Sequence, residues 1–126
     1  ENRIGMNLGG GVDLPFGRVQ MTVAHPSSQL PDGSYGGNPA GFVLSLPEGN
    51  VYFACDTALF SDMQLIGAAG IELAVVPIGD LFTMGQSDSI EAIKLIQPKR
   101  VAWAEHVRAN TSAAPIVLEP GGKITL

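Results

Sequence analysis

The stretch Val51-Tyr52-Phe53-Ala54-Cys55-Asp56-Thr57 is an apolar run of strand type that ends abruptly on an acid and a hydroxyl. A strand that is buried on both faces reads as a continuous apolar run, and its carboxyl end is where open α/β folds place their chemistry. Residues 58–67 then have the pattern of a helix that ends near Gly67. Asp56 can bind a metal, orient a base or cap that helix. From chemistry alone, a cap made by Asp56 or Thr57 is the commonest of these roles.

The rest of the chain alternates between short apolar runs and turn-forming segments, which predicts a single domain over residues 1–126. We expect strands at residues 12–14, 18–24, 41–46, 50–55, 71–78, 100–102, 116–118 and 124–126, and helices at 58–67, 87–96 and 103–110. The helix at 87–96 carries Ile90, Ile93 and Ile96 on one face and has polar residues that can cap its start. This order fits an α/β (α+β) fold in which one mixed β-sheet has its helices on one face.

The composition fits a soluble globular domain and argues against several partners. The 126 residues are 45% hydrophobic and only 15% charged, which is enough for one modest core and suggests that much of the surface is covered by a partner or by further chain. The net charge of −5, with scattered Lys and Arg, argues against nucleic acid. No run is long enough to span a membrane and nothing resembles a signal peptide, so we expect a cytoplasmic protein. The single cysteine, Cys55, excludes an internal disulfide and is expected to pack as a small hydrophobe in its strand.

Three stretches occur in an order and at a spacing that carry more information than any one of them alone. They are Pro31-Asp32-Gly33-Ser34-Tyr35-Gly36-Gly37-Asn38-Pro39-Ala40-Gly41-Phe42, Cys55-Asp56-Thr57-Ala58-Leu59-Phe60-Ser61-Asp62-Met63 and Pro77-Ile78-Gly79-Asp80-Leu81-Phe82-Thr83-Met84-Gly85. Together they resemble the metal-dependent hydrolase branch of the metallo-β-lactamase superfamily, a group of lactonase-like and largely uncharacterised bacterial proteins. The second stretch normally reads Gly-Asp-Thr in that branch, and its Asp bridges the metals. The resemblance therefore implies that Asp56 is a metal ligand.

The main metal-binding motif of that superfamily, His-x-His-x-Asp-His, does not occur anywhere in this chain. The first residues already resemble a segment about midway along the family's sequence. The resemblance therefore implies the C-terminal half of a metallo-β-lactamase-type αββα sandwich, with a truncated gene or further sequence as the alternatives. Such a half would expose the apolar face of its sheet, so we expect a homodimer or larger homo-oligomer that covers this face.

Two histidines are candidates for the other ligand positions. The family usually has a His directly before a Ser-Ser pair, whereas here the order is His25-Pro26-Ser27-Ser28, so proline takes the ligand's place and His25 stands one residue early. His25 would bind a metal only if the loop were rearranged; a half-exposed loop histidine is the alternative. His106 lies in a segment that resembles the family's final helix rather than its ligand loop, and the intervening dozen or so residues are missing.

Three further polar residues are expected near the site. Asp80 follows a buried strand as Asp56 does, and it either bonds a metal ligand or stabilises its loop through an Asx turn. Thr57 is expected to support its neighbour Asp56. Asn38 before Pro39 either lies near the site or simply fixes a turn.

A complete family site would perform metal-assisted hydrolysis of an ester, lactone or phosphoester with two divalent ions, Zn²⁺ or Mn²⁺. The chain as written offers Asp56 and, if its loop is rearranged, His25, whereas a catalytic zinc needs about three protein ligands. We therefore expect that the chain as written is an inactive part of a metal-dependent hydrolase. If it is active, we expect a small-molecule substrate, and we expect no cofactor besides the divalent metal. The alternative is a catalytically degenerate half-domain that acts as a self-associating or structural module.

Overall fold

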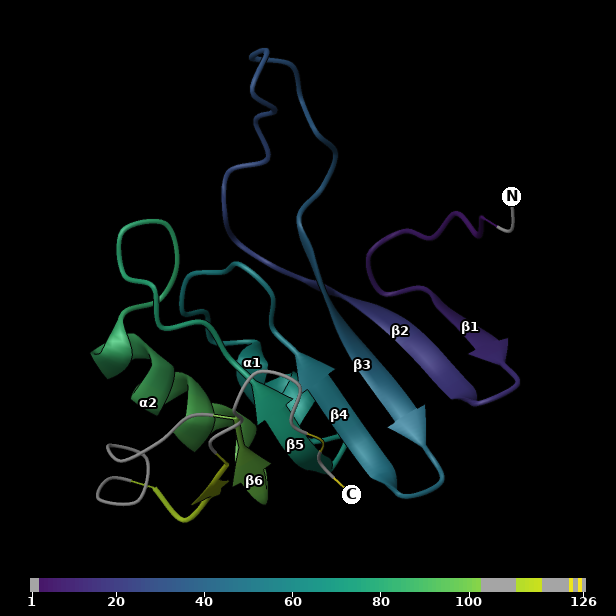
Figure 1. The fold of residues 1–126 in the computed structure, drawn as a ribbon, viewed down its shortest axis with the longest axis vertical. Helices are drawn as coiled ribbons and strands as arrows, with labels where there is room; N and C mark the ends of the chain where they lie inside the picture. The colour runs from purple at the N-terminus through teal and green to yellow at the C-terminus, as the bar shows by residue number, and fades with distance from the viewer. Residues whose placement is uncertain (1–2, 103–110, 117–122, 124, 126) are drawn as a thin grey trace.

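The computed structural model describes residues 3–102, 111–116, 123 and 125. In this part of the chain the backbone forms one seven-stranded sheet whose strands follow one another in sequence order (Figure 1). The strands are β1 (Gly11–Leu14), β2 (Gly17–Val23), β3 (Ala40–Leu46), β4 (Gly49–Phe53), β5 (Ile71–Val75), β6 (Arg100–Val101) and β7 (Ala114–Pro115). The helices are α1 (Met63–Gly67) and α2 (Gln86–Ile96).

The sheet changes character at β4. Strands β1 to β4 pair antiparallel, with short turns between β1 and β2 and between β3 and β4 and a long loop between β2 and β3, and β4 to β7 pair parallel. Parallel neighbours need a crossover connection, and the segments that contain α1 and α2 supply the crossovers from β4 to β5 and from β5 to β6. At the first turn Gly17 has φ 146°, and a Cβ there would lie 2.2 Å from the Ser45 carbonyl oxygen, so only glycine fits. The sheet is therefore mixed, as the sequence predicts.

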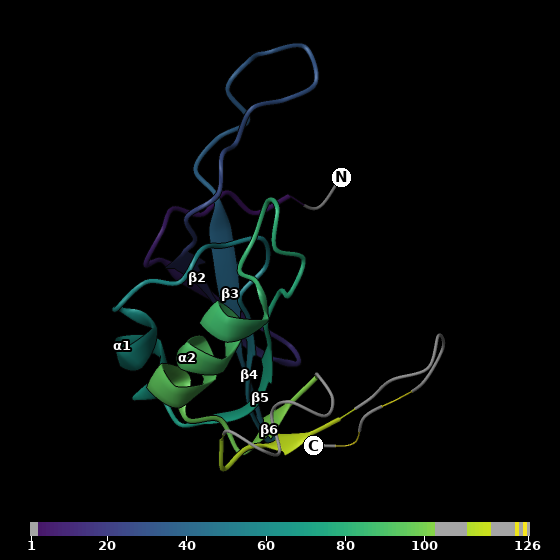
Figure 2. The same cartoon turned by 90° about the vertical axis from the view of Figure 1, so that its left-hand side faces the viewer.

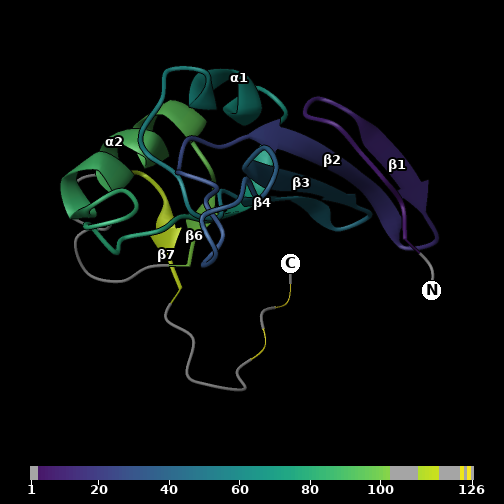
Figure 3. The same ribbon diagram turned by 90° about the horizontal axis from the view of Figure 1, so that it is seen from above.

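Both helices lie on one face of the sheet, which confirms the predicted layering (Figures 2 and 3). The hydrophobic core fills the space between the helices and the sheet. One row of paired residues, from Val43 through Tyr52 and Ala74 to Val101, points into this core. The helices contribute the other side of the core through the buried residues Met63, Ala92, Ile93 and Ile96. None of the described helices has the length and apolar character needed to cross a bilayer.

The structure corrects several predicted boundaries. Strand β4 ends at Phe53, β5 ends at Val75, and α1 begins at Met63 rather than at residue 58. Helix α2 has Gly85 as its N-cap without a side-chain hydrogen bond, so the predicted polar cap is wrong. The predicted helix at 103–110 and most of the predicted strands at 116–118 and 124–126 fall outside the described residues, and β7 was not expected.

Cys55 does not pack in a strand as predicted. It follows the end of β4, its thiol is exposed, and its φ of 56° is in the left-handed region. The chain leaves the sheet at this point because a left-handed residue cannot continue an extended strand. Asp56 is thereby carried out of the strand into an exposed connection.

Candidate functional site

The segments that carry the predicted site residues meet at one edge of the sheet. Strands β2, β4 and β5 run in the same direction, because β2 and β4 are both antiparallel to β3 and β5 is parallel to β4. Their carboxyl ends therefore lie at the same edge, from which the loops that follow them extend (Figure 1). We call this the carboxyl edge. His25 follows β2, Asp56 follows β4, Asp80 follows β5, and Asn38 lies just before β3 at the same edge.

Thr57 joins three of the connections at this edge. Its side chain is fully buried, and its Oγ1 accepts a hydrogen bond of 3.0 Å from the backbone N–H of His25. The same hydroxyl donates to the carbonyl of Ala58 at 2.9 Å. The carbonyl oxygen of Thr57 accepts a further bond of 2.9 Å from the Met84 backbone N–H, in the connection before α2. Thr57 thus fixes the segments after β2, β4 and β5 relative to one another, a support broader than the one predicted for Asp56 alone.

Asp56 is exposed, and its carboxylate forms no hydrogen bond or ion pair with a described residue. It does not cap α1, which begins seven residues later and has Asp62 at its N-cap position. The predicted capping role of Asp56 or Thr57 is therefore wrong. The neighbouring Cys55 thiol has a pKa raised by partial burial and, to a smaller extent, by the negative charge of Asp56. A raised pKa keeps the thiol protonated at neutral pH.

His25 is exposed, as expected for a loop histidine, but its ring is held in place. The imidazole meets the ring of Phe60 edge-on, with the ring centroids 4.9 Å apart and an interplanar angle of 61°. Its backbone N–H is held by Thr57, so both the ring and the main chain are fixed against the connection that follows β4. The structure therefore brings His25 to the segment that carries Asp56. Phe60 was not singled out from the sequence, because an aromatic contact across two loops leaves no local pattern.

Asp80 lies in a closed loop. It has φ 69°, its N–H bonds the Met84 carbonyl at 3.2 Å, and its own carbonyl accepts the Thr83 N–H at 3.2 Å. Thr83 Oγ1 accepts the Gly79 N–H at 3.1 Å. The Asp80 carboxylate lies against Gly85, where an added Cβ would be 2.9 Å from Oδ1. The loop is thus closed by backbone and threonine bonds rather than by an Asx turn of Asp80, and the predicted contact with a metal ligand stays a prediction.

Asn38 is not joined to the other candidates by any hydrogen bond among the described residues. Its Oδ1 accepts a short hydrogen bond from the Tyr35 hydroxyl within the long loop between β2 and β3. The same loop is stabilised by Asp32, whose carboxylate accepts bonds from both the N–H and the hydroxyl of Ser34. These bonds lower the pKa of Asp32, the side-chain bond having the larger effect. Asn38 therefore fixes its own loop, which is the simpler of the two predicted roles.

Ser89 is a second structural residue that the sequence did not reveal. It is fully buried on α2, and its hydroxyl lies 2.5 Å from the Pro77 carbonyl and 2.9 Å from the Gly85 carbonyl. It ties the start of α2 to the end of β5. The sequence signal for its burial is the helical spacing of Ser89 with Ala92 and Ile93, which places it on the buried face of α2. This spacing does not show which groups the hydroxyl contacts.

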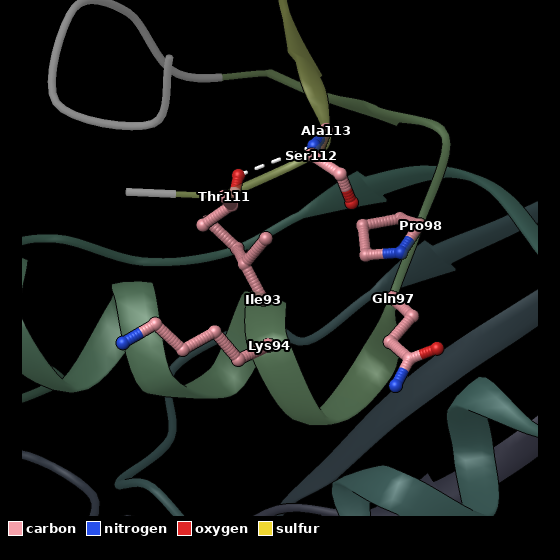
Figure 4. A pocket seen from close by; sticks show the side chains of 7 residues that line it. All are labelled: Ile93, Lys94, Gln97, Pro98, Thr111, Ser112 and Ala113. Carbon is pink, nitrogen blue, oxygen red and sulfur yellow. Dashed lines mark hydrogen bonds between the residues drawn. The ribbon is translucent and has the colours of Figure 1, made fainter. Parts of the chain in front are cut away.

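One cavity adjoins the candidate site, and another lies away from it. A hollow of about 440 Å³ lies beside Asp80 at the start of α2. Another of about 260 Å³ lies at the C-terminal end of α2, against residues 111–113 (Figure 4). Among the described residues, its lining has one ionisable side chain, Lys94, and no acid or histidine. Catalytic chemistry is therefore better sought at the carboxyl edge.

The carboxyl edge does not contain a complete metal site. Within the described ranges, no three His, Cys, Asp or Glu side chains are grouped so that they could hold a metal ion. Asp56 and His25 supply a carboxylate and an imidazole, but a catalytic zinc needs about three protein ligands. His106, the other histidine, lies outside the described residues. The described donors therefore do not by themselves fit a metal centre.

Comparison with known proteins decides the family. The sequence model of the Beta-lactamase superfamily domain matches residues 1–106. The chain belongs to this family. A UPF0173 metal-dependent hydrolase of Thermus thermophilus, TTHA1283, is 51% identical over 96 residues, which cover 76% of this chain and 43% of the relative. A UPF0173 metal-dependent hydrolase of Deinococcus radiodurans is 48% identical over 106 residues, covering 84% of this chain and 46% of the relative.

A solved structure confirms the fold. The metallo hydrolase Igni18 of Ignicoccus hospitalis superposes with a TM-score of 0.78 at 31% sequence identity, covering 95% of this chain and 58% of that protein. The predicted family resemblance and the metallo-β-lactamase-type fold are thereby confirmed. The chain spans slightly less than half the length of the two UPF0173 relatives. Membership of this family of metal-dependent hydrolases implies a divalent metal in the complete protein.

Proposed function

We propose that this chain supplies the Asp56 side of a divalent-metal hydrolase site, and that the remaining metal ligands lie outside the described residues. The observation that carries the proposal is the carboxyl edge, where Thr57 fixes the segments bearing His25 and Asp56 to each other. An exposed carboxylate without a partner among the described residues is available to a metal, and a carboxylate with an imidazole suits Zn²⁺ or Mn²⁺. When bound, such an ion activates water for hydrolysis. Because the described donors are too few, we propose that the 126-residue chain alone is inactive.

The charge around the site favours a neutral ester or lactone over a phosphoester. Between Arg18 and Lys94 the sequence contains no Lys or Arg, and this span includes every segment that follows β2, β4 and β5. Proteins that bind phosphate esters usually neutralise the oxygens with arginine or lysine. The exposed apolar side chains of Tyr35, Leu81 and Phe82 lie instead in the loops at this edge. They suit an acyl group better than an anion.

Metal binding by the 126-residue chain tests the role of Asp56. We expect isothermal titration calorimetry to show weak binding of Zn²⁺ or Mn²⁺ that Asp56→Asn abolishes. Asp62→Asn, which removes a nearby exposed acid from the same connection, is the matched control and should leave binding unchanged. Equal binding by the wild type and Asp56→Asn would reject Asp56 as a ligand.

The substrate class is tested in a chimera that joins this chain to the unmatched part of the Thermus thermophilus relative. The chimera is expected to hydrolyse p-nitrophenyl butyrate or a γ-lactone, and to leave bis(p-nitrophenyl) phosphate intact. The 126-residue chain alone should hydrolyse none of them above the buffer rate. A chimera that prefers the phosphodiester would overturn the proposed ester or lactone class.

The self-associating module is the second candidate function, and one observation favours it. The face of the sheet opposite the helices is apolar, as the register of the strands shows. That face can act in association whether or not Asp56 ever binds a metal.

A further inference from the structure

Two buried hydroxyl groups on the helix side of the sheet have no hydrogen-bond partner among the described residues. They are the hydroxyl of Tyr52 on β4 and Oγ1 of Thr22 on β2. Tyr52 is fully buried, and the Thr22 oxygen is buried although the residue as a whole is half-buried. A buried hydroxyl without a partner has lost its bonds to water, and this cost is rarely left uncompensated in a folded protein.

The two hydroxyls are neighbours even though β3 lies between their strands. Thr22 is paired with Gly41 of β3, and Tyr52 is paired with Val43, two residues further along the same strand. Residues two apart on a strand share a face, so both side chains stand on the helix side. Burial raises the pKa of Tyr52 to about 12, and the nearby Thr22 hydroxyl opposes part of this rise. The positions of the two groups nevertheless do not make a hydrogen bond between them.

Further oxygen atoms converge beside these hydroxyls at Gly41, which is buried and has no side chain. The point where a Cβ would stand lies 2.8 Å from Thr22 Oγ1, 2.8 Å from the Phe53 carbonyl oxygen and 3.2 Å from the Ala54 carbonyl oxygen. We call this place, with the Tyr52 hydroxyl beside it, the polar notch. A carbonyl oxygen can accept two hydrogen bonds, and a hydroxyl both donates and accepts. The polar notch therefore offers acceptors for both protons of a water molecule and a donor for its lone pair.

We propose that the polar notch binds a single structural water, which accepts a hydrogen bond from the Tyr52 hydroxyl and donates to Thr22 Oγ1 and to one of the two carbonyl oxygens. Buried waters typically make about three such bonds to groups that are otherwise unpaired. Water fits better than an ion, because the polar notch contains only neutral groups and a buried charge without a counter-charge is far more costly. This inference does not depend on the proposed hydrolase function.

The water joins β2 to β4 just beneath the carboxyl edge. Thr22 lies three residues before His25, and Tyr52 lies four residues before Asp56. The hydrogen bond from the His25 N–H to Thr57 Oγ1 connects the same two segments at the edge itself. Because β3 separates β2 from β4 in the sheet, no ladder hydrogen bond can hold these two strands to each other. The water therefore adds an internal polar contact between the segments that carry His25 and Asp56.

Oxygen-17 relaxation dispersion counts the buried waters that exchange slowly, and it tests the proposal in solution with the 126-residue chain. Tyr52→Phe combined with Thr22→Val removes both hydroxyls and nearly preserves the shape of both side chains, so this variant should lose one slow water. Thr22→Ser retains the hydroxyl and is the matched control that should leave the count unchanged. A crystal structure of the wild-type chain should place the water within hydrogen-bond distance of both hydroxyls, and it decides alone if the double variant fails to fold.

Thermal unfolding separates a bridged hydroxyl from an unpaired one. Tyr52→Phe and Thr22→Val each remove one partner of the water and should each lower the thermal midpoint by a few degrees, whereas removal of an unpaired hydroxyl would raise it. A higher midpoint in both variants would therefore overturn the proposal. An equal count of slow waters in the wild type and the double variant would do the same. So would a crystal structure in which the Tyr52 and Thr22 hydroxyls bond each other directly, with no water beside Gly41.

Discussion

The core beneath α2 and the carboxyl edge of the sheet are held together by different forces. In the core, fully buried apolar side chains such as Ile93, Ile96 and Val101 pack between helix and sheet. At the carboxyl edge the connections are held by a few polar atoms, above all the hydroxyls of Thr57 and Thr83. The core therefore depends on volume, whereas the edge depends on individual hydrogen bonds.

This difference separates stability from the placement of the candidate site. Loss of a core methylene leaves a cavity and destabilises the whole domain. Loss of one hydroxyl at the edge releases one connection, while the sheet below it remains paired. Substitutions in the two regions should therefore differ both in the size of their effect and in how far it spreads.

The largest effect is expected from Ile93→Ala in α2. Ile93 is 1% exposed and lies in the centre of the core. Truncation of a buried isoleucine costs about 2–5 kcal/mol through lost burial and the cavity left behind. Urea unfolding at one fixed protein concentration measures this loss. Lys94→Ala, the exposed neighbour that pairs with Glu91, is the control and should cost at most about 0.5 kcal/mol. A similar loss of unfolding free energy in the two variants would show that Ile93 does not lie in the core.

Thr57→Val should have a smaller and more local effect. Valine keeps the shape of the side chain but leaves the His25 N–H without its acceptor, at a cost of about 1–3 kcal/mol. Hydrogen exchange should accelerate at the His25 amide and remain slow at the centre of β4. Thr57→Ser retains the hydroxyl and should restore slow exchange at His25. Uniformly faster exchange throughout the sheet would show that Thr57 belongs to the core rather than to the edge.

Cys55→Gly tests strain at the same edge. Cys55 has φ 56°, a conformation that costs a residue with a Cβ about 1–2 kcal/mol relative to the right-handed region. Glycine removes this strain but gains entropy in the unfolded chain, so the net stabilisation should be at most about 1 kcal/mol. Cys55→Ala removes the thiol and retains the strain, and its midpoint of thermal unfolding should match the wild type. An equal rise of the thermal midpoint in both variants would show that loss of the thiol, rather than relief of strain, causes the effect.

Much of the sheet could be predicted from the sequence because its strands are marked by apolar runs between turn residues. The strand expected at 41–46 is β3 to within one residue, and the helix expected at 87–96 is α2 to within one residue. The prediction of α2 succeeded because Ile90, Ile93 and Ile96 recur at helical spacing; Ile93 and Ile96 are buried in the structure and Ile90 is half-buried. These elements are defined by residues close together in the sequence.

The carboxyl edge was harder to predict because distant residues decide it. Residues 58–62 have helix-forming composition, but in the fold this segment forms the non-helical connection whose Phe60 packs against His25. The apolar run suggested that the strand continued through Cys55, since cysteine gives no sign of a left-handed backbone. The joining role of Thr57 depends on His25 and Met84, which are distant in the sequence. The family resemblance identified Asp56 as a candidate ligand but not what holds its neighbours in place.

The smallest effect is expected at the opposite edge of the sheet, where charge rather than hydroxyls joins the strands. Glu72 at the start of β5 pairs with Lys99 at 2.9 Å and with Arg100 at 3.3 Å. The hydrogen bond from Lys99 is the main cause that lowers the pKa of Glu72 below its usual value of 4.5. A lowered pKa in the folded state stabilises the protein above the ordinary pKa, and this contribution is lost as the pH falls through the folded-state value.

Glu72→Gln should therefore lower the thermal midpoint slightly at pH 7 and make less difference at an acidic pH below the lowered pKa of Glu72, where the wild-type carboxyl is protonated as well. Glu48→Gln, an exposed acid of the β3–β4 turn that has no ion pair with a described residue, should change neither midpoint. Ion pairs at the protein surface contribute little, and salt screens them, so the difference at pH 7 should shrink in 1 M NaCl. If Glu72→Gln lowered the thermal midpoint more than Thr57→Val does, charge at this edge would stabilise the sheet more than the buried hydroxyl does at the carboxyl edge.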